Sequence, residues 1–146
     1  MDIIKDFYDI IRKAEVINLA TSENGSVTMR CVSPVFYQDK VLFFTSPDSE
    51  KYRQLKANPH CCINSGLYYA QAEAEFSGQT MLDINKELRD AYCEKFPGAF
   101  DEGLEFGGRK DDFILLTLKH LSGWTYENEN HSEKDIPTTP FSIDLE

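Results

Sequence analysis

Short apolar segments separated by turn residues are the feature that most limits what this chain can fold into. We predict strands at 16–21, 27–37, 41–45, 60–64, 68–81, 113–118 and 123–126. Asn24-Gly25, between the first two strands, is a strong signal for a tight hairpin. Helical spacing of apolar residues is confined to 2–14, 47–57 and 84–96. This pattern favours a mostly β fold, an antiparallel sheet or small barrel with peripheral helices, over a doubly wound sheet.

The chain of 146 residues has the length of one ordinary domain. We assign residues 1–127 to that domain and expect residues 97–112 to form a loop. From residue 128 onward the chain is polar and acidic, with Phe141 and Ile143 as isolated apolar anchors. We therefore interpret residues 128–146 as a C-terminal tail.

The net charge of −10 argues against partners with anionic backbones or surfaces, namely nucleic acids and membranes. No stretch approaches the roughly 20 apolar residues of a membrane span. The N-terminal segment is amphipathic and charged, unlike a secretion signal. The four cysteines show no CxxC spacing, so reduced thiols are the simplest interpretation. We expect a cytoplasmic protein.

The stretch VLFFTSPDSEKYRQLKANP, residues 41–59, allows two interpretations. An apolar strand ends at Thr45, and Ser46-Pro47 has the composition of a helix N-cap followed by the first helical residue. In one interpretation this is plain capping. In the other, the free amides of the helix, the hydroxyls and Lys51 bind a phosphate.

Arg30 is a single cation in the otherwise largely apolar segment 27–37. A cation there should not be buried without a partner. One interpretation is a salt bridge to one of the many acidic residues. The other is that Arg30 faces the same anion as Lys51, from a nearby strand.

The order of these features resembles the pyridoxamine 5′-phosphate oxidase-like family of FMN-binding split barrels. The resemblance covers roughly residues 3–127. It is carried by Arg30-Cys31-Val32, Phe43-Phe44-Thr45-Ser46, Lys51, Asn58-Pro59, Ser77-Gly78 and the strand from Ile114-Leu115-Leu116 to Trp124. Such proteins begin with a helix, and the same order of hairpin, strand, helix and long strands follows.

The resemblance implies a six-stranded split barrel that forms a homodimer, with FMN at the interface. By position, Arg30, Thr45, Ser46 and Lys51 would contact the phosphate or the polar edge of the ring. The main chain of Met29, Arg30, Cys31 and Val32 would lie along the isoalloxazine. Trp124 and the strand around Gln71 to Glu73 would complete the site from the partner chain.

Two departures from the family shape the functional hypothesis. Glu50 precedes Lys51 where pyridoxamine phosphate oxidases carry adjacent basic residues, and the segment after Trp124 is acidic rather than basic. We therefore predict an FMN-dependent oxidoreductase that passes electrons from NAD(P)H to a small acceptor, and not pyridoxamine phosphate oxidase itself. The alternatives are a flavin or haem carrier or sensor without turnover, and a flavin-free barrel with an ordinary capped helix.

Other motifs give weaker signals. His60-Cys61-Cys62 cannot all ligate one metal ion, because neighbours on a strand point to opposite faces, so we expect buried thiols and no metal. GLEFGGRK, residues 103–110, lacks the Lys-Ser/Thr ending of a P-loop; we expect a flexible loop, with a lid that brings Arg109 or Lys110 to an anionic substrate as the alternative. His120 is expected to be a polar residue at a strand end, and a haem ligand is the alternative.

Overall fold

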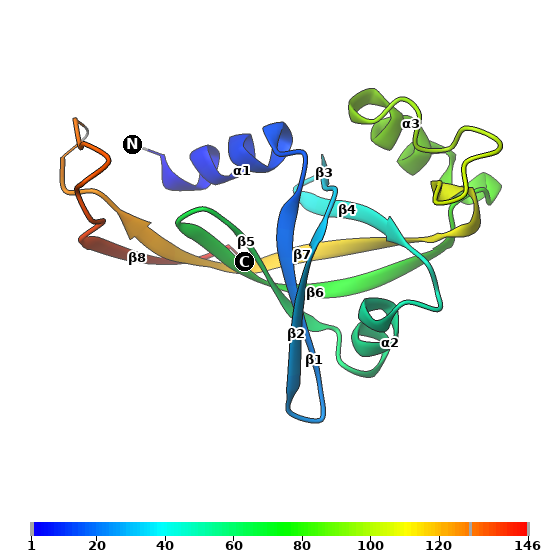
Figure 1. Ribbon diagram of the computed structural model, residues 1–146, viewed down its shortest axis with the longest axis horizontal. Helices are drawn as coiled ribbons and strands as arrows, with labels where there is room; N and C mark the ends of the chain where they lie inside the picture. The colour runs from blue at the N-terminus through cyan, green and yellow to red at the C-terminus, as the bar shows by residue number, and fades with distance from the viewer. Residues whose placement is uncertain (1, 129, 146) are drawn as a thin grey trace.

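The computed structural model describes residues 2–128 and 130–145 and shows one antiparallel sheet with helices at its periphery (Figure 1). The strands are β1 (Ile17–Glu23), β2 (Ser26–Val32), β3 (Val35–Tyr37), β4 (Lys40–Thr45), β5 (His60–Ser65), β6 (Tyr68–Gln79), β7 (Asp112–Thr125) and β8 (Thr139–Asp144). The helices are α1 (Ile3–Lys13), α2 (Glu50–Ala57) and α3 (Lys86–Lys95), with short 3-10 turns at Asp83–Asn85 and Gly108–Lys110. The predicted mostly β, antiparallel fold class is confirmed.

The sheet contains eight strands rather than the six expected for the barrel. Its order is β2-β1-β5-β6-β7-β4-β3, and β8 pairs with β7. Two differences raise the count. The predicted strand 27–37 is interrupted at Ser33-Pro34, where Pro34 has no amide hydrogen to donate to a ladder, and gives β2 and β3. β8 is an additional strand.

β7 organises the sheet because it uses both of its edges. β6 follows one edge of β7 along most of its length. On the other edge, β4 (Lys40–Thr45) pairs with the first half of β7, and β8 pairs with the second half. The two strands predicted at 113–118 and 123–126 are therefore one continuous strand. The sequence pattern suggested a break because the polar residues Lys119, His120 and Ser122 interrupt the apolar run.

The segment expected to be a polar tail contains β8. Its apolar residues Phe141 and Ile143 alternate with polar ones, and the ring of Phe141 lies 5.5 Å from that of Tyr68 between centroids. His120 on β7 reinforces this pairing through hydrogen bonds to Asp144 at 2.7 Å and Ser142 at 2.6 Å. The strand forms because β7 presents an open edge, which composition alone does not reveal.

Buried side chains form two clusters on the helix-covered parts of the sheet. The larger cluster joins Phe7 and Ile11 of α1 to the inner residues of β1, β5, β6 and β7. The smaller cluster packs Leu88 and Tyr92 of α3 against Phe113. The N-terminal helix is thus confirmed, and no helix among the described residues is long and apolar enough to cross a membrane.

The hairpin β1–β2 projects from the body of the sheet, and α2 lies beside it (Figure 1). Its turn residues, Asn24 and Gly25, have φ values of 51° and 82°. Both are positive, as a two-residue type I′ turn requires. The predicted Asn-Gly hairpin is confirmed, and its register sets Thr21 opposite Thr28.

Candidate functional site

Arg30 lies on the side of the β1–β2 hairpin that faces α2, and its side chain is 21% exposed. The guanidinium donates hydrogen bonds to Thr21 Oγ1 at 2.6 Å and Thr28 Oγ1 at 2.5 Å. It also forms an ion pair with Glu50 at 3.3 Å. Glu50 is half-exposed, so this contact is weak in water.

Gln54 of α2 completes the setting of Arg30. The hydroxyl of Thr28 donates to Gln54 Oε1 at 2.8 Å, and the hydroxyl of Thr21 donates to the same oxygen. Thr21 and Gln54 are 1% and 3% exposed, so this network is shielded from water. Because each hydroxyl gives its hydrogen to Gln54, its lone pairs are left to accept from Arg30. The guanidinium is held in one orientation before any ligand arrives.

Lys51 is the second cation at this end of the hairpin. Burial, and then the neighbouring charge of Arg30, lower the pKa of Lys51, while Asp111 acts in the opposite direction. No hydrogen bond or ion pair holds Lys51 within the part of the chain that the structure describes. Arg30 and Lys51, called the cation pair below, therefore repel each other, and a bound anion would relieve this repulsion.

The start of α2 differs in detail from the sequence prediction. Ser49, not Ser46, caps the helix, because its hydroxyl accepts from the amide of Tyr52 at 3.3 Å. Ser46 instead accepts from the amide of Asp48 at 3.2 Å in the preceding turn. Pro47 consequently precedes the helix and is not its first residue.

The geometry at the start of α2 still offers donors for an anion. Thr45, at the end of β4, is hydrogen-bonded to Ser49 at 3.0 Å. The first amides of any helix lack acceptors within the helix, and here they lie next to Lys51. The hydroxyls of Thr45 and Ser49 are already used, since Ser49 donates to the carbonyl oxygen of Ser46 at 2.8 Å and Thr45 donates to Ser49. Helix amides and two cations are the donors left for a phosphate.

Comparison with known proteins supports the assignment of the fold. Residues 3–121 match the model of the pyridoxamine 5′-phosphate oxidase family. The chain belongs to this family. A pyridoxine/pyridoxamine 5′-phosphate oxidase of Porphyromonas gingivalis is 25% identical over 84 residues, which cover 58% of this chain and 39% of that protein. The chain thus matches about two fifths of the length of that curated relative.

Solved structures share the fold of this family member at low sequence identity. A FAD-binding protein of Mesorhizobium loti has a TM-score of 0.64 and 16% identity, with 84% of this chain and 94% of that chain covered. A haem storage protein of Vibrio cholerae has a TM-score of 0.64 and 15% identity, with 82% and 92% covered. Both confirm the split-barrel fold, and the family is one of flavin-binding proteins.

Of the other predicted site residues of this family member, Met29, Cys31 and Gln71 lie on the opposite face of the sheet, whereas Val32, on the same face as Arg30, is buried in the core. In β2, Met29 and Cys31 are exposed and alternate with Arg30. The ladders pair Met29 with Ala20, Ala20 with Cys62, and Cys62 with Gln71. Residues directly opposite in antiparallel strands share a face, so Met29 and Gln71 belong to one surface.

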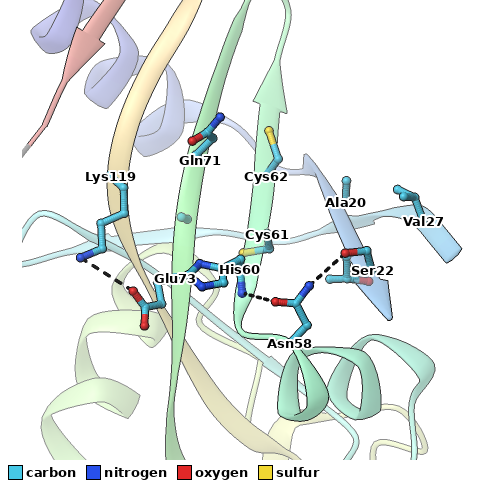
Figure 2. Close-up of a pocket in the computed structure, with 12 residues that line it drawn as sticks. Ala20, Ser22, Val27, Asn58, His60, Cys61, Cys62, Gln71, Glu73 and Lys119 are labelled. Atoms are coloured by element: carbon cyan, nitrogen blue, oxygen red, sulfur yellow. Dashed lines mark hydrogen bonds and ion pairs between the residues drawn. The ribbon is translucent and has the colours of Figure 1, made fainter. Parts of the chain in front are cut away.

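Figure 2 shows the open pocket of about 640 Å³ on this surface, with Gln71 and Cys62 on neighbouring strands. Glu73 and Lys119 form an ion pair at 3.9 Å at its side, and Asn58 hydrogen-bonds to Ser22 at 3.1 Å at its base. Among the described residues, no cluster of three or more histidine, cysteine or carboxylate side chains is arranged to hold a metal ion.

One protomer does not bring all the predicted residues together. Arg30, Thr45 and Lys51 converge, whereas Gln71 lines the pocket of Figure 2 and Trp124 lines a separate pocket beside Tyr68 and Tyr126. The contacts expected from the partner chain therefore stay a prediction. The residues that hold Arg30, namely Thr21, Thr28 and Gln54, were missed. The Asn-Gly turn carried a signal for Thr21 and Thr28, because it fixes their register.

Proposed function

We propose that this family member binds FMN and acts as an oxidoreductase that passes electrons from NAD(P)H to a small acceptor. The observation that carries the proposal is the cation pair, in which Arg30 is rigidly held and Lys51 has no hydrogen bond or ion pair among the described residues. In a chain with a net charge of −10, two converging cations need a reason. The phosphate of FMN provides one.

The residues of this chain would divide the work of binding. Lys51 and the first amides of α2 would hold the phosphate, Thr45 would support the turn that carries them through its hydrogen bond to Ser49, and Arg30 would contact the phosphate or the polar edge of the ring. Bound FMN supplies the hydride and electron chemistry, while the protein supplies binding, orientation and electrostatics. A fixed guanidinium near the ring stabilises the negative charge of reduced flavin.

We further propose that the complete site needs a second copy of this chain. Met29, Cys31 and Gln71 lie on a sheet face that no helix covers in Figure 1, and Val27 and Met29 are 70% and 67% exposed there. Packing this face against its copy would bury exposed apolar side chains. It would also bring Gln71 and Trp124 of one chain toward the cation pair of the other.

Pyridoxamine phosphate oxidase activity is not part of this proposal. That substrate carries its own phosphate, which requires a second cluster of cations. The described part of the segment after β7 contains Glu127, Glu133 and Asp135 and a single basic residue, Lys134. A haem carrier is the second candidate, because the solved relative from Vibrio cholerae stores haem, but the cation pair favours a phosphate ligand. Free cysteines at 31, 61, 62 and 93 support a cytoplasmic location.

The test is a visible spectrum of the purified protein followed by titrations with FMN and with riboflavin, which lacks the phosphate. We expect saturable quenching of FMN fluorescence, binding of riboflavin weaker by at least about tenfold, and bleaching of the flavin by NADH or NADPH. Arg30→Ala and Lys51→Ala should each weaken FMN binding by more than about tenfold. Equal affinity for FMN and riboflavin, or unchanged FMN affinity in both variants, would refute the phosphate site. A Soret band would favour the haem carrier instead.

A further inference from the structure

A second pocket, of about 350 Å³, lies at the other end of the molecule from the cation pair. It is bounded by α1, by the turn before β6, and by the end of β7 with the chain that follows it. In Figure 1 the start of α1 and the segment after β7 lie at the same end of the sheet, next to the β5–β6 turn. None of the residues proposed for phosphate binding lines this pocket.

Aromatic rings form most of its wall. Trp124 is 41% exposed although it lies in a long central strand. Tyr68 is packed from behind by Phe7 at 6.0 Å and by Phe141 at 5.5 Å between ring centroids. Tyr126 stacks on His131 with centroids 3.5 Å apart and an angle of 5° between the rings. Side chains fixed in this way form a preformed surface rather than one that must collapse around a ligand.

Asp6 of α1 places one carboxylate in this aromatic pocket. Burial first, and then the negative charge of Asp6, raise the pKa of Tyr68, which shows that the carboxylate acts on the aromatic wall. Within residues 2–128 and 130–145, the Asp6 side chain has neither a hydrogen bond nor an ion pair. Its place in the first turn of α1 suits the helix dipole. The dipole accounts for an acid at this position but not for the rings opposite it.

We propose that this pocket binds a small organic cation, a substituted ammonium group with an apolar body. The faces of tryptophan and tyrosine rings attract cations, and Asp6 supplies the opposite charge. A neutral apolar ligand would cover the carboxylate without compensating for its lost hydration. An anion would be repelled by Asp6 and by the net charge of −10. A bare metal ion finds only one carboxylate here and no second acidic ligand among the lining residues.

Trp124 is the one residue that this pocket shares with the proposed dimer site, and none of the residues proposed to bind phosphate lines it, so organic-cation binding here does not require flavin. It also gives Trp124 a use within a single protomer. If the pocket opens toward the flavin of a partner chain, the organic cation becomes a candidate substrate. If it does not, the pocket is a separate binding site.

The chain has one tryptophan, so its fluorescence reports directly on this pocket. Purified protein is titrated with choline and, in parallel, with 3,3-dimethylbutan-1-ol, which has the same shape without the charge. We expect a saturable change in tryptophan emission with choline and affinity for the alcohol lower by at least about tenfold. Asp6→Asn should weaken choline binding by about tenfold or more, and Asp6→Glu should restore part of it.

Glu15→Gln is the matched control, because it removes one negative charge from the end of the same helix region outside the pocket. Its affinity for choline should equal that of the unaltered protein. Equal binding of choline and the neutral alcohol, no saturable response to choline, or an equal loss in Asp6→Asn and Glu15→Gln would each overturn the proposal. Should Asp6→Asn fail to fold, the comparison of choline with its neutral analogue in the unaltered protein decides alone. FMN titration of the same samples shows separately whether the proposed flavin site holds.

Discussion

Burial, and then the charge of Arg30 across the end of the β1–β2 hairpin, lower the pKa of Lys51, so the ligand-free protein maintains two like charges in close range. Arg30 is fixed by hydroxyl acceptors, whereas Lys51 is half-buried and, among the described residues, has the charge of Asp111 nearby but no hydrogen bond or ion pair. Such an arrangement costs stability when empty and gains it when an anion binds. Functional sites commonly show this exchange of stability for binding.

The first prediction concerns Lys51 and pH. Because its pKa is lowered in the folded state, the folded protein binds this proton less tightly than the unfolded chain does. The cost of the charged ammonium is therefore fully present below the folded pKa, and it disappears as pH rises toward the ordinary lysine pKa of about 10.4. Lys51→Met should raise the melting temperature of ligand-free protein at pH 7 by about 1–3 °C.

Lys56→Met is the control for this prediction, since it removes a charge from the same helix away from Arg30. Lys56 lies 4.0 Å from the centre of the Phe76 ring, so its loss should lower the melting temperature slightly. FMN affinity should fall in Lys51→Met and stay unchanged in Lys56→Met. A lower melting temperature for ligand-free Lys51→Met would contradict the proposed repulsion.

The second prediction concerns Gln54, which accepts hydrogen bonds from Thr21 and Thr28. Gln54→Leu should lower the free energy of unfolding by about 1–3 kcal/mol, because the buried hydroxyl of Thr21 and the partly buried hydroxyl of Thr28 lose their acceptor. It should also weaken FMN binding, because Arg30 loses its fixed orientation. Gln54→Glu keeps an acceptor and should be the milder change. Urea unfolding and FMN titration measure the two effects, and unaltered FMN affinity in Gln54→Leu would show that the network does not position Arg30.

The third prediction concerns Glu50, which competes with a bound anion for Arg30 at 3.3 Å. Glu50→Gln should strengthen the binding of FMN or inorganic phosphate by about two- to fivefold at low salt, the range expected for an exposed ion pair. The gain should shrink as ionic strength rises, because salt screens the competing charge. Glu87→Gln on α3 provides a control with the same charge change. An equal gain in both variants would mean that net charge, and not Glu50, is responsible.

The fourth prediction concerns Gly123 in β7, where the amide of Trp124 donates to the carbonyl of Leu67 at 3.2 Å. Gly123 has a φ of +156°, and a Cβ there would lie 2.1 Å from that carbonyl oxygen. Gly123→Ala should cost about 3 kcal/mol or more, since backbone must move. Gly103 also has a positive φ, but a Cβ added there would meet open space. Gly103→Ala should therefore cost only about 1 kcal/mol. If chemical denaturation showed similar losses of unfolding free energy in Gly123→Ala and Gly103→Ala, the close contact at Gly123 would be contradicted.

The fifth prediction concerns thiol reactivity. Burial, and then Cys62, raise the pKa of Cys61 to about 12, so at pH 8 only roughly one molecule in ten thousand carries the reactive thiolate. Cys31 is exposed on β2. In the separated protomer, Ellman's reagent should label Cys31 quickly and Cys61 only after unfolding; in the proposed dimer, which covers the face that carries Cys31, labelling of Cys31 should be slower. Cys31→Ser should remove the fastest labelling phase, and Cys61→Ser should leave it intact. The reverse result would contradict the exposure of Cys31 and the burial of Cys61.

Local pattern was sufficient for much of the fold. Alternation, turn chemistry and helical spacing predicted the mostly β class, the hairpin at Asn24-Gly25 and the helix that begins at Ile3. These features depend on neighbours in the chain, so the sequence carries them directly. The placement of Arg30 and Lys51 near one another followed from the family resemblance and agrees with their electrostatic coupling.

Tertiary structure decided what depends on residues far apart in sequence. β8 exists because β7 leaves an edge open beyond β4, and no local pattern marks that edge. Gln54 reaches Thr21 and Thr28 only when α2 packs beside the hairpin. The aromatic pocket joins Asp6 to Trp124 across almost the whole chain. The sequence by itself determined which strands, turns and cations are available, whereas packing determined which of them meet, because such contacts depend on distance in space and not on distance along the chain.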